Sequence, residues 1–167
     1  TEPTSPLPAS LPTTPLAIPD YRTFWIARFF SVVATSGMVV ILGYQLYDVA
    51  RGEYGMSMAE AAFQLGLLGL AQFLPLFLLT PVAGLVADRF DRRNVAALAM
   101  CIDLTVALTL ALTTGANLLS LPLLFGLAAL HGTARVFIGP ALSSIAPNVV
   151  PAALMPKAVA INSMAWQ

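Results

Sequence analysis

Residues 84–95 read GLVADRFDRRNV and lie between two long apolar runs. Five of these twelve residues are formally charged, whereas only 10% of the whole chain is charged. The chain has 167 residues, of which 58% are hydrophobic, and its mean hydropathy is +0.83. A soluble domain has about 45–50% apolar and about 25% charged residues. The composition therefore indicates a membrane protein in which this stretch forms a charged turn between two membrane segments.

Four apolar segments around this stretch are long enough to cross a bilayer, which needs about 20 residues in a helix rising about 1.5 Å per residue. The predicted spans cover residues 24–47, 65–87, 95–113 and 118–140, and a fifth begins near residue 157. The predicted fold class is an all-α, polytopic transmembrane helical bundle. The chain starts without Met and stops a few residues into its fifth apolar segment, so we expect a piece of a longer protein.

The ends of the first two segments carry local signals. Residues 1–20 form the N-terminal tail, and the six prolines within residues 1–19 favour a flexible or polyproline-like conformation there. Ser57 followed by Glu60 matches a capping box and predicts a helix that begins near residue 58. Pro75 and Pro81 lie inside that helix and should bend it.

The cations predict how the chain is oriented. Six of them fall on or near one side of the zigzag, namely Arg22, Arg28, Arg89, Arg92, Arg93 and Lys157, and only Arg51 falls on the other. The positive-inside rule then places the tail, residues 88–93 and residues 147–157 in the cytoplasm. We expect a multi-pass protein of the cytoplasmic membrane with its N-terminus in the cytoplasm.

The charged turn contains residues that a purely topological signal does not require, although a purely topological role is the simpler alternative. Its arginines alternate with Asp88 and Asp91, and acidic residues contribute little to topology. Asp91 is placed to cap the helix that follows, while Arg89 lies at the C-terminal end of the helix before it. Gly84, one turn before Asp88, leaves room for another helix, as do Gly66 and Gly69 earlier in the same segment.

Asp103 lies about nine residues into the third span, near the middle of the membrane. A carboxylate there costs at least about 2.5 kcal/mol, so the side chain should face protein or water. Its helix face carries mostly small residues, which fits packing against another helix. Two interpretations stay open: a site that binds a proton or the substrate, or a structural partner of Arg28, His131 or Arg135.

Three further ionisable residues lie in or near the predicted spans. His131 and Arg135 are four residues apart and share one face of the fourth segment. His131 is either a coupling residue or a buried histidine with its hydrogen bonds satisfied, and Arg135 either couples transport or extends to the membrane surface. Arg28, about one turn inside the first span, is a further candidate for proton or substrate coupling, or it extends to the head groups. The threonines at 105, 109 and 113 can bond to their own helix backbone.

Several function classes are excluded or disfavoured. The formal net charge is zero, which argues against a nucleic-acid partner. Cys101 is the single cysteine, so a disulfide within the chain and a thiolate metal cluster are excluded. We find no phosphate-binding loop, no metal cluster and no nucleophile with its base, and therefore predict no enzyme, no catalytic residue and no cofactor.

The charged turn resembles the signature of the major facilitator superfamily, which joins the second and third helices of those transporters. The matching residues are Gly84, Ala87, Asp88, Arg89, Arg92 and Arg93. The family usually has glycine where this chain has Asp91, and the Asp variant resembles the branch that contains enterobactin exporters and related bacterial drug exporters. A second stretch, RVFIG at residues 135–139, is similar to a motif in the fourth helix of the family.

The resemblance implies the N-terminal part of a major-facilitator fold and a gating role for Asp88, Arg89 and Arg92 on the cytoplasmic side. It also implies export of a small organic molecule, siderophore or drug-like, driven by a proton gradient in a bacterial membrane. The implied partners are the lipid bilayer, the small-molecule substrate and the missing C-terminal half of the same protein. An importer of the same superfamily and a non-transporting membrane scaffold remain alternatives.

Overall fold

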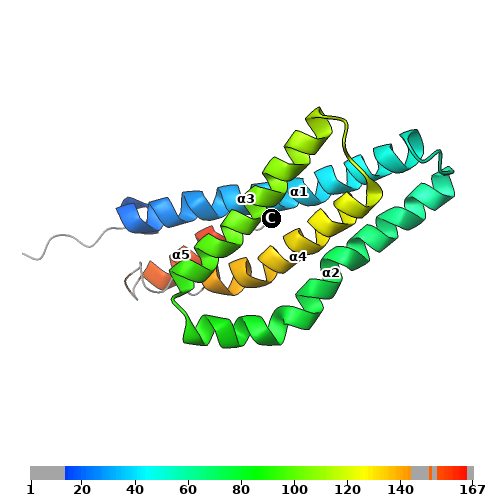
Figure 1. Cartoon of the computed structure of the whole chain (residues 1–167). Helices are drawn as coiled ribbons and strands as arrows, with labels where there is room; N and C mark the ends of the chain where they lie inside the picture. The colour runs from blue at the N-terminus through cyan, green and yellow to red at the C-terminus, as the bar shows by residue number, and fades with distance from the viewer. Residues whose placement is uncertain (1–13, 144–150, 152–153, 165–167) are drawn as a thin grey trace, which may run out of the picture. The chain divides into compact units, whose positions relative to one another are not determined.

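The computed structural model of the chain describes residues 14–143, 151 and 154–164. Their elements, in order, are η1 (Pro15–Ala17), α1 (Pro19–Gly52), α2 (Met58–Arg89), α3 (Arg92–Gly115), α4 (Leu121–Ser143) and α5 (Met155–Met164) (Figure 1). Within the described ranges there is no strand, and the predicted all-α fold class is confirmed. Residues 1–13 of the predicted tail and most of the connection at 147–157 lie outside the description.

Four of these helices are long and apolar enough to cross a membrane. The candidate spans are Pro19–Gly52, Met58–Val86, Arg93–Gly115 and Leu121–Ile138. Each of the four complete predicted spans overlaps one of these helices, while the limits of the membrane within each helix, and the truncated fifth span, stay predictions. The architecture is that of a multi-pass helical membrane protein.

Helical structure begins earlier in the proline-rich segment than the sequence predicts. Residues up to 20 were expected to be a tail, yet Pro15–Ala17 form a turn of 3-10 helix and α1 begins at Pro19. Proline is well tolerated in the first turn of a helix, because the backbone N–H that it lacks has no partner there.

The chain divides into two compact units, and the boundary falls within α1. One unit comprises Thr1–Val32 and Ala146–Gln167, and the other comprises Val33–Ile145. In the first unit, the hydroxyl of Tyr21 in α1 donates to the carbonyl of Ala158 in α5 at 2.9 Å. The indole N–H of Trp25 donates to the carbonyl of Ile161 at 3.2 Å. These two bonds attach α5 to the beginning of α1.

In the second unit, α4 is the central helix. It packs against α2 on one side and α3 on the other, whereas α2 and α3 contact each other little (Figure 1). Half of the most apolar stretch of α4 is buried (50%), compared with 6% for α2. The apolar core of this unit joins the second half of α1 to α2, α3 and α4, and includes Leu42, Leu46, Leu68, Val106, Leu110, Leu124 and Ala128.

The predicted start of α2 is confirmed. Ser57 is its N-cap: the Ser57 hydroxyl accepts from the Glu60 N–H at 3.3 Å, and the Glu60 carboxylate accepts from the Ser57 N–H at 2.8 Å. Pro75 and Pro81 lie inside α2, which changes direction along its course (Figure 1). Internal proline removes a backbone hydrogen bond and is a usual cause of such a bend.

Helices α4 and α2 approach each other closely at Gly132 of α4. A Cβ built there would lie 2.3 Å from the carbonyl oxygen of Gln72 in α2, so only glycine fits without movement of the backbone. The sequence analysis had singled out Gly66 and Gly69 for close packing. No described atom comes within 4 Å of a Cβ built at either of these positions.

Candidate functional site

The charged turn connects α2 to α3 through only two residues, Phe90 and Asp91. Phe90 ends α2 with its N–H donating to the Val86 carbonyl at 2.9 Å. Asp91 is the N-cap of α3, and its carboxylate accepts from the Arg93 N–H at 2.9 Å. The predicted capping role of Asp91 is confirmed, and the turn is short because Phe90, the C-cap of α2, is followed directly by Asp91, the N-cap of α3.

The charged side chains of this turn point outward. Arg89, Asp91 and Arg93 are exposed, and no ion pair joins them among the side chains that the structure describes. The side chains of Asp88 and Arg92 lie outside the description. A Cβ built at Gly84 meets no described atom within 4 Å, so this part of the turn is open for contact with other helices.

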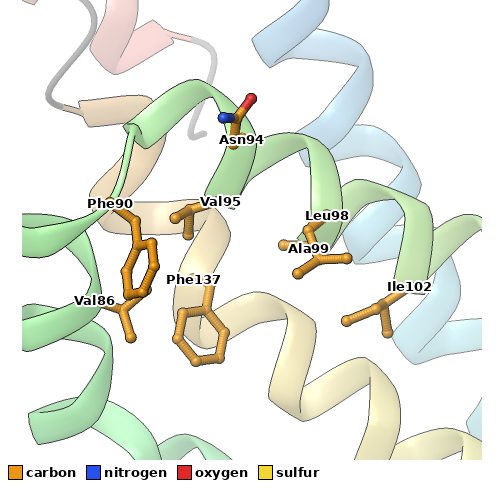
Figure 2. A pocket seen from close by; sticks show the side chains of 8 residues that line it. All are labelled: Val86, Phe90, Asn94, Val95, Leu98, Ala99, Ile102 and Phe137. Atoms are coloured by element: carbon orange, nitrogen blue, oxygen red, sulfur yellow. The ribbon is translucent and has the colours of Figure 1, made fainter.

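An apolar hollow of about 380 Å³ lies beside the turn, bounded by α2, α3 and α4 (Figure 2). Figure 2 shows Val86, Phe90 and Phe137 grouped at one part of its wall and the side chains of α3 along another. Its full lining is Val86, Phe90, Asn94, Val95, Leu98, Ala99, Ile102 and Phe137. The sequence did not predict this hollow, because its wall combines apolar residues from three separate helices.

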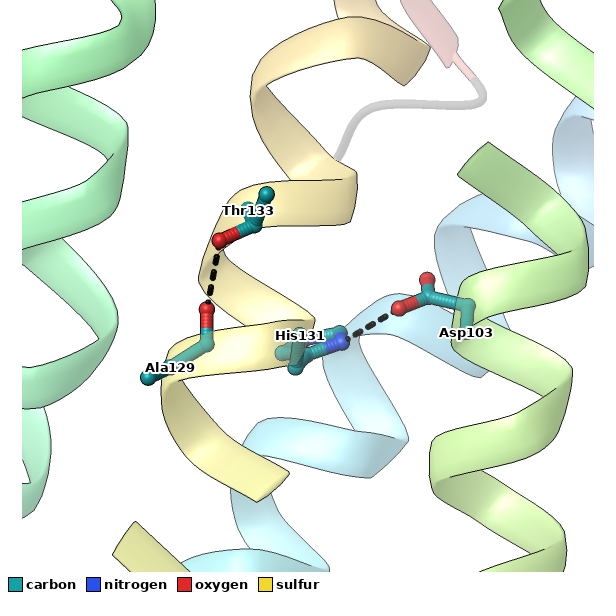
Figure 3. Close-up of polar contacts among 4 residues, drawn as sticks. All are labelled: Asp103, Ala129, His131 and Thr133. Carbon is teal, nitrogen blue, oxygen red and sulfur yellow. Dashed lines mark hydrogen bonds and ion pairs between the residues drawn. The ribbon is translucent and has the colours of Figure 1, made fainter. Parts of the chain in front are cut away.

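An ion pair joins α3 to α4, two of the candidate spanning helices. His131 Nδ1 lies 2.8 Å from Asp103 Oδ1 (Figure 3). Asp103 shares its helix face with the buried residues Ala99, Val106 and Leu110, which bring that face of α3 against the bundle. Of the three partners considered for Asp103, the structure brings His131 to it.

Burial differs between the two members of this Asp103–His131 pair. The side chain of His131 is 0% exposed, and that of Asp103 is 20% exposed. An ionised carboxylate only accepts hydrogen bonds, so Nδ1 carries the hydrogen when Asp103 is charged. His131 Nε2 is buried and has no hydrogen-bond partner among the described residues. Leaving such an atom unsatisfied costs about 1–3 kcal/mol.

Neighbouring hydroxyl groups do not extend the pair. The Thr133 hydroxyl donates to the carbonyl of Ala129, one turn earlier in α4, at 2.9 Å (Figure 3). Thr105 and Thr113 of α3 likewise bond to Cys101 and Thr109 of their own helix, at 2.8 and 2.7 Å. The predicted self-bonding is confirmed for these two threonines.

The other two candidate coupling residues differ in exposure. Arg135 is exposed, one turn beyond His131 along α4. Arg28 is 5% exposed and belongs to the other compact unit. Among the described residues, no group of three or more His, Cys, Asp or Glu side chains is placed to hold a metal ion.

The spanning helices and the charged turn define a multi-pass membrane protein of transporter type. The model of the family described as transmembrane secretion effector matches residues 10–167, and the chain belongs to this family, which is of the major facilitator kind. The resemblance seen in the charged turn is thereby confirmed at the level of the superfamily. Comparison with curated proteins and comparison with solved structures each gave no match.

Proposed function

We propose that this protein is a secondary active transporter that exports a small organic molecule across the bacterial cytoplasmic membrane by alternating access. The observation that carries the proposal is the family match over residues 10–167 of a chain with four candidate spanning helices. The description of the family as a secretion effector favours export over import. In such folds, the substrate binds near the bilayer midplane and the two halves of the protein rock around it.

The proposed gate is the charged turn, with Asp88, Arg89 and Arg92 as its contacting residues. The two-residue connection and the Asp91 cap support this role, because they hold the ends of α2 and α3 close together. The exposed side chain of Arg89 and the open space at Gly84 leave this surface free for helices outside this chain. In this scheme the contact closes the cytoplasmic side and breaks when the transporter opens inward.

The proposed energy source is the proton gradient, and the proposed substrates are siderophore-like or drug-like molecules. An ionisable pair in the membrane interior supports proton coupling, because such residues commonly mark proton or substrate pathways. The proposed orientation places the N-terminus and the charged turn in the cytoplasm, as the distribution of arginines indicates.

Transport into everted membrane vesicles tests this function. Vesicles containing the protein are given ethidium or a labelled iron-free catecholate siderophore, with the proton gradient intact or collapsed by a protonophore. We expect accumulation of at least one probe above empty-vector vesicles, and its loss without the gradient. The Arg89→Ala variant should lower the rate by about fivefold or more, the scale of a coupling free energy above about 1 kcal/mol.

Each alternative gives a different result in the same assay. An importer would accumulate the probes in right-side-out vesicles and not in everted ones. A scaffold would transport in neither orientation, and Arg89→Ala would then change nothing. Either result would contradict the proposed export.

A further inference from the structure

Two neighbouring residues of α4 attach two different helices to it. Gly132 touches α2, where the Gln72 carbonyl leaves no room for a Cβ. His131, the residue before it, is bonded to Asp103 of α3. At this level α2 is held by backbone packing, which does not depend on pH. By contrast, α3 is held by a bond between two ionisable groups.

We propose that the Asp103–His131 pair binds one proton as a unit, and that loss of this proton loosens α3 from α4. The proposal rests on the proposed transport function, since it names the residues that would carry the coupling proton. It assigns the proton to the pair rather than to either residue, and it gives the proton a structural effect.

The net charge of the pair explains why the state with one bound proton is favoured. With one proton, the pair is a carboxylate beside an imidazolium, and its net charge is zero. A pair with no proton is net negative and a pair with two is net positive, and either charge is unfavourable in a medium of low dielectric constant. In the one-proton state the Nδ1–H of the imidazolium donates to Asp103 Oδ1 across the 2.8 Å contact.

Loss of the proton changes the strength of this contact. When the proton leaves for water, His131 becomes neutral and donates its Nδ1–H to the Asp103 carboxylate. The ion pair is replaced by a hydrogen bond in which only the acceptor is charged, so the Coulomb attraction between opposite charges is lost. The remaining net negative charge also favours movement of Asp103 toward water. Both effects weaken the attachment of α3.

The geometry gives the two residues separate tasks. His131 is fully buried and cannot exchange a proton directly with solvent. Asp103 is 20% exposed, so it is the member of the pair that this chain leaves partly uncovered, and we assign to it the entry and exit of the proton. Because Nε2 of His131 has no described partner, no other described group holds the imidazole when the bond to Asp103 weakens.

Other ionisable groups on the helices packed together here lie away from the pair or make no bond to it. Arg135 is exposed on α4, and Arg28 of α1 belongs to the other compact unit. The remaining groups with described side chains sit toward helix ends or are not bonded to the pair: Tyr44, Tyr47, Asp48 and Arg51 of α1, Glu60 and Arg89 of α2, and Arg93 and Cys101 of α3. Among the described residues no hydrogen bond or ion pair joins any of them to Asp103 or His131.

Movement of α3 would also reach the charged turn. The helix begins next to Asp91, which caps it, and it contacts α2 little, so α4 provides most of its support within this unit. A change at Asp103 is therefore transmitted along a rigid helix to the residues of the proposed gate. The pair thus connects proton loading to the position of the turn.

Infrared difference spectroscopy tests the proton site without any substrate. The purified protein is titrated with acid, and the ring bands of the protonated imidazole are followed; His131 is the single histidine of the chain. We expect an imidazolium band that is absent in His131→Gln, and that is displaced along the pH axis in Asp103→Asn. Thr133→Val is the matched control, because Thr133 bonds to its own helix, and it should leave the band unchanged. A titration unaffected by Asp103→Asn would overturn the proposal.

Spin-label distances test the structural effect. Cys101 is the single cysteine, on α3, and Leu130 on α4 lines the same groove, so labels at Cys101 and Leu130→Cys report the separation of these helices. We expect the distance distribution to change with pH in this protein and not after Asp103→Asn is added. Absence of any pH response before that substitution, or the same response after it, would refute the proposed loosening.

These readouts separate the two proposals. If the pair titrates as expected and vesicles transport no probe, the transport function fails and the proton site stands. If proton-driven transport is observed and is unchanged in Asp103→Asn and His131→Gln, the proton site fails and the function stands. Monodisperse elution from a sizing column shows that each variant is folded.

Discussion

At the scale of single residues, the contacts of α4 with two neighbouring helices depend on the chemical identity of residues 131 and 132. His131 places a buried nitrogen beside Asp103. Gly132 has no side chain that would collide with Gln72. Substitution of either residue would affect a different neighbouring helix. The stability of the α2–α4 contact can therefore be tested separately from the proton site.

The Gly132→Ala variant should be destabilised. Its Cβ would lie 2.3 Å from the Gln72 carbonyl oxygen, and backbone cannot be displaced as easily as the end of a side chain. We expect a loss of about 1–3 kcal/mol in the free energy of unfolding, as for other overpacked sites. Thermal unfolding in detergent, followed by tryptophan fluorescence, measures it.

The matched control is Gly126→Ala in the same helix. No described atom lies within 4 Å of a Cβ built at Gly126, and alanine favours helix over glycine by about 1 kcal/mol. This variant should be as stable as the parent or more stable. If Gly132→Ala behaved in the same way, the close approach of α2 and α4 would be refuted.

At the scale of elements, the start of α3 determines how the charged turn is built. A helix leaves its first N–H groups without partners, and the Asp91 carboxylate satisfies one of them, the N–H of Arg93. The negative charge of Asp91 also interacts favourably with the positive end of the helix dipole.

Replacing Asp91 with alanine should loosen the first turn of α3. Loss of an N-cap of this kind costs about 1 kcal/mol. Hydrogen exchange of the amides at residues 93–96 should become faster by about fivefold, because that free energy corresponds to such a factor. Asp91→Asn keeps an oxygen that can accept the same bond and should stay close to the parent rate. Equal exchange in all three proteins would show that Asp91 does not hold the turn.

At the scale of the whole molecule, the arginines predict the orientation in the membrane. Two turns, near residues 54 and 117, should face one side, and the charged turn should face the other, because two helices of spanning length, α2 and α3, connect them in sequence. The positive-inside rule assigns the charged turn to the cytoplasm.

Cysteine labelling in cells measures this orientation. In a Cys101→Ala background, Tyr54→Cys and Asn117→Cys should react with a membrane-impermeant maleimide added outside. Phe90→Cys should react only after the cells are opened. Labelling of Phe90→Cys in intact cells would reverse the proposed topology and, with it, the cytoplasmic position of the gate.

The elements of this fold were predictable because their signals are local. Apolar length predicted the four spanning helices, and the pattern of Ser57 and Glu60 predicted where α2 begins. Asp91 was recognised as a cap from its place before a helix. Each of these inferences depends on residues within a few positions of one another, where backbone geometry leaves few alternatives.

The sequence by itself determined that this chain crosses a membrane as helices and carries a charged turn of the major facilitator type. Only the tertiary structure decided that Asp103 pairs with His131, that Gly132 and not Gly66 or Gly69 is the close contact, and that α4 lies at the centre. The physical reason is that apolar residues cover every side of these helices. In lipid their sequence pattern therefore does not indicate which face meets a neighbour, and the fit between side chains far apart in the chain decides it.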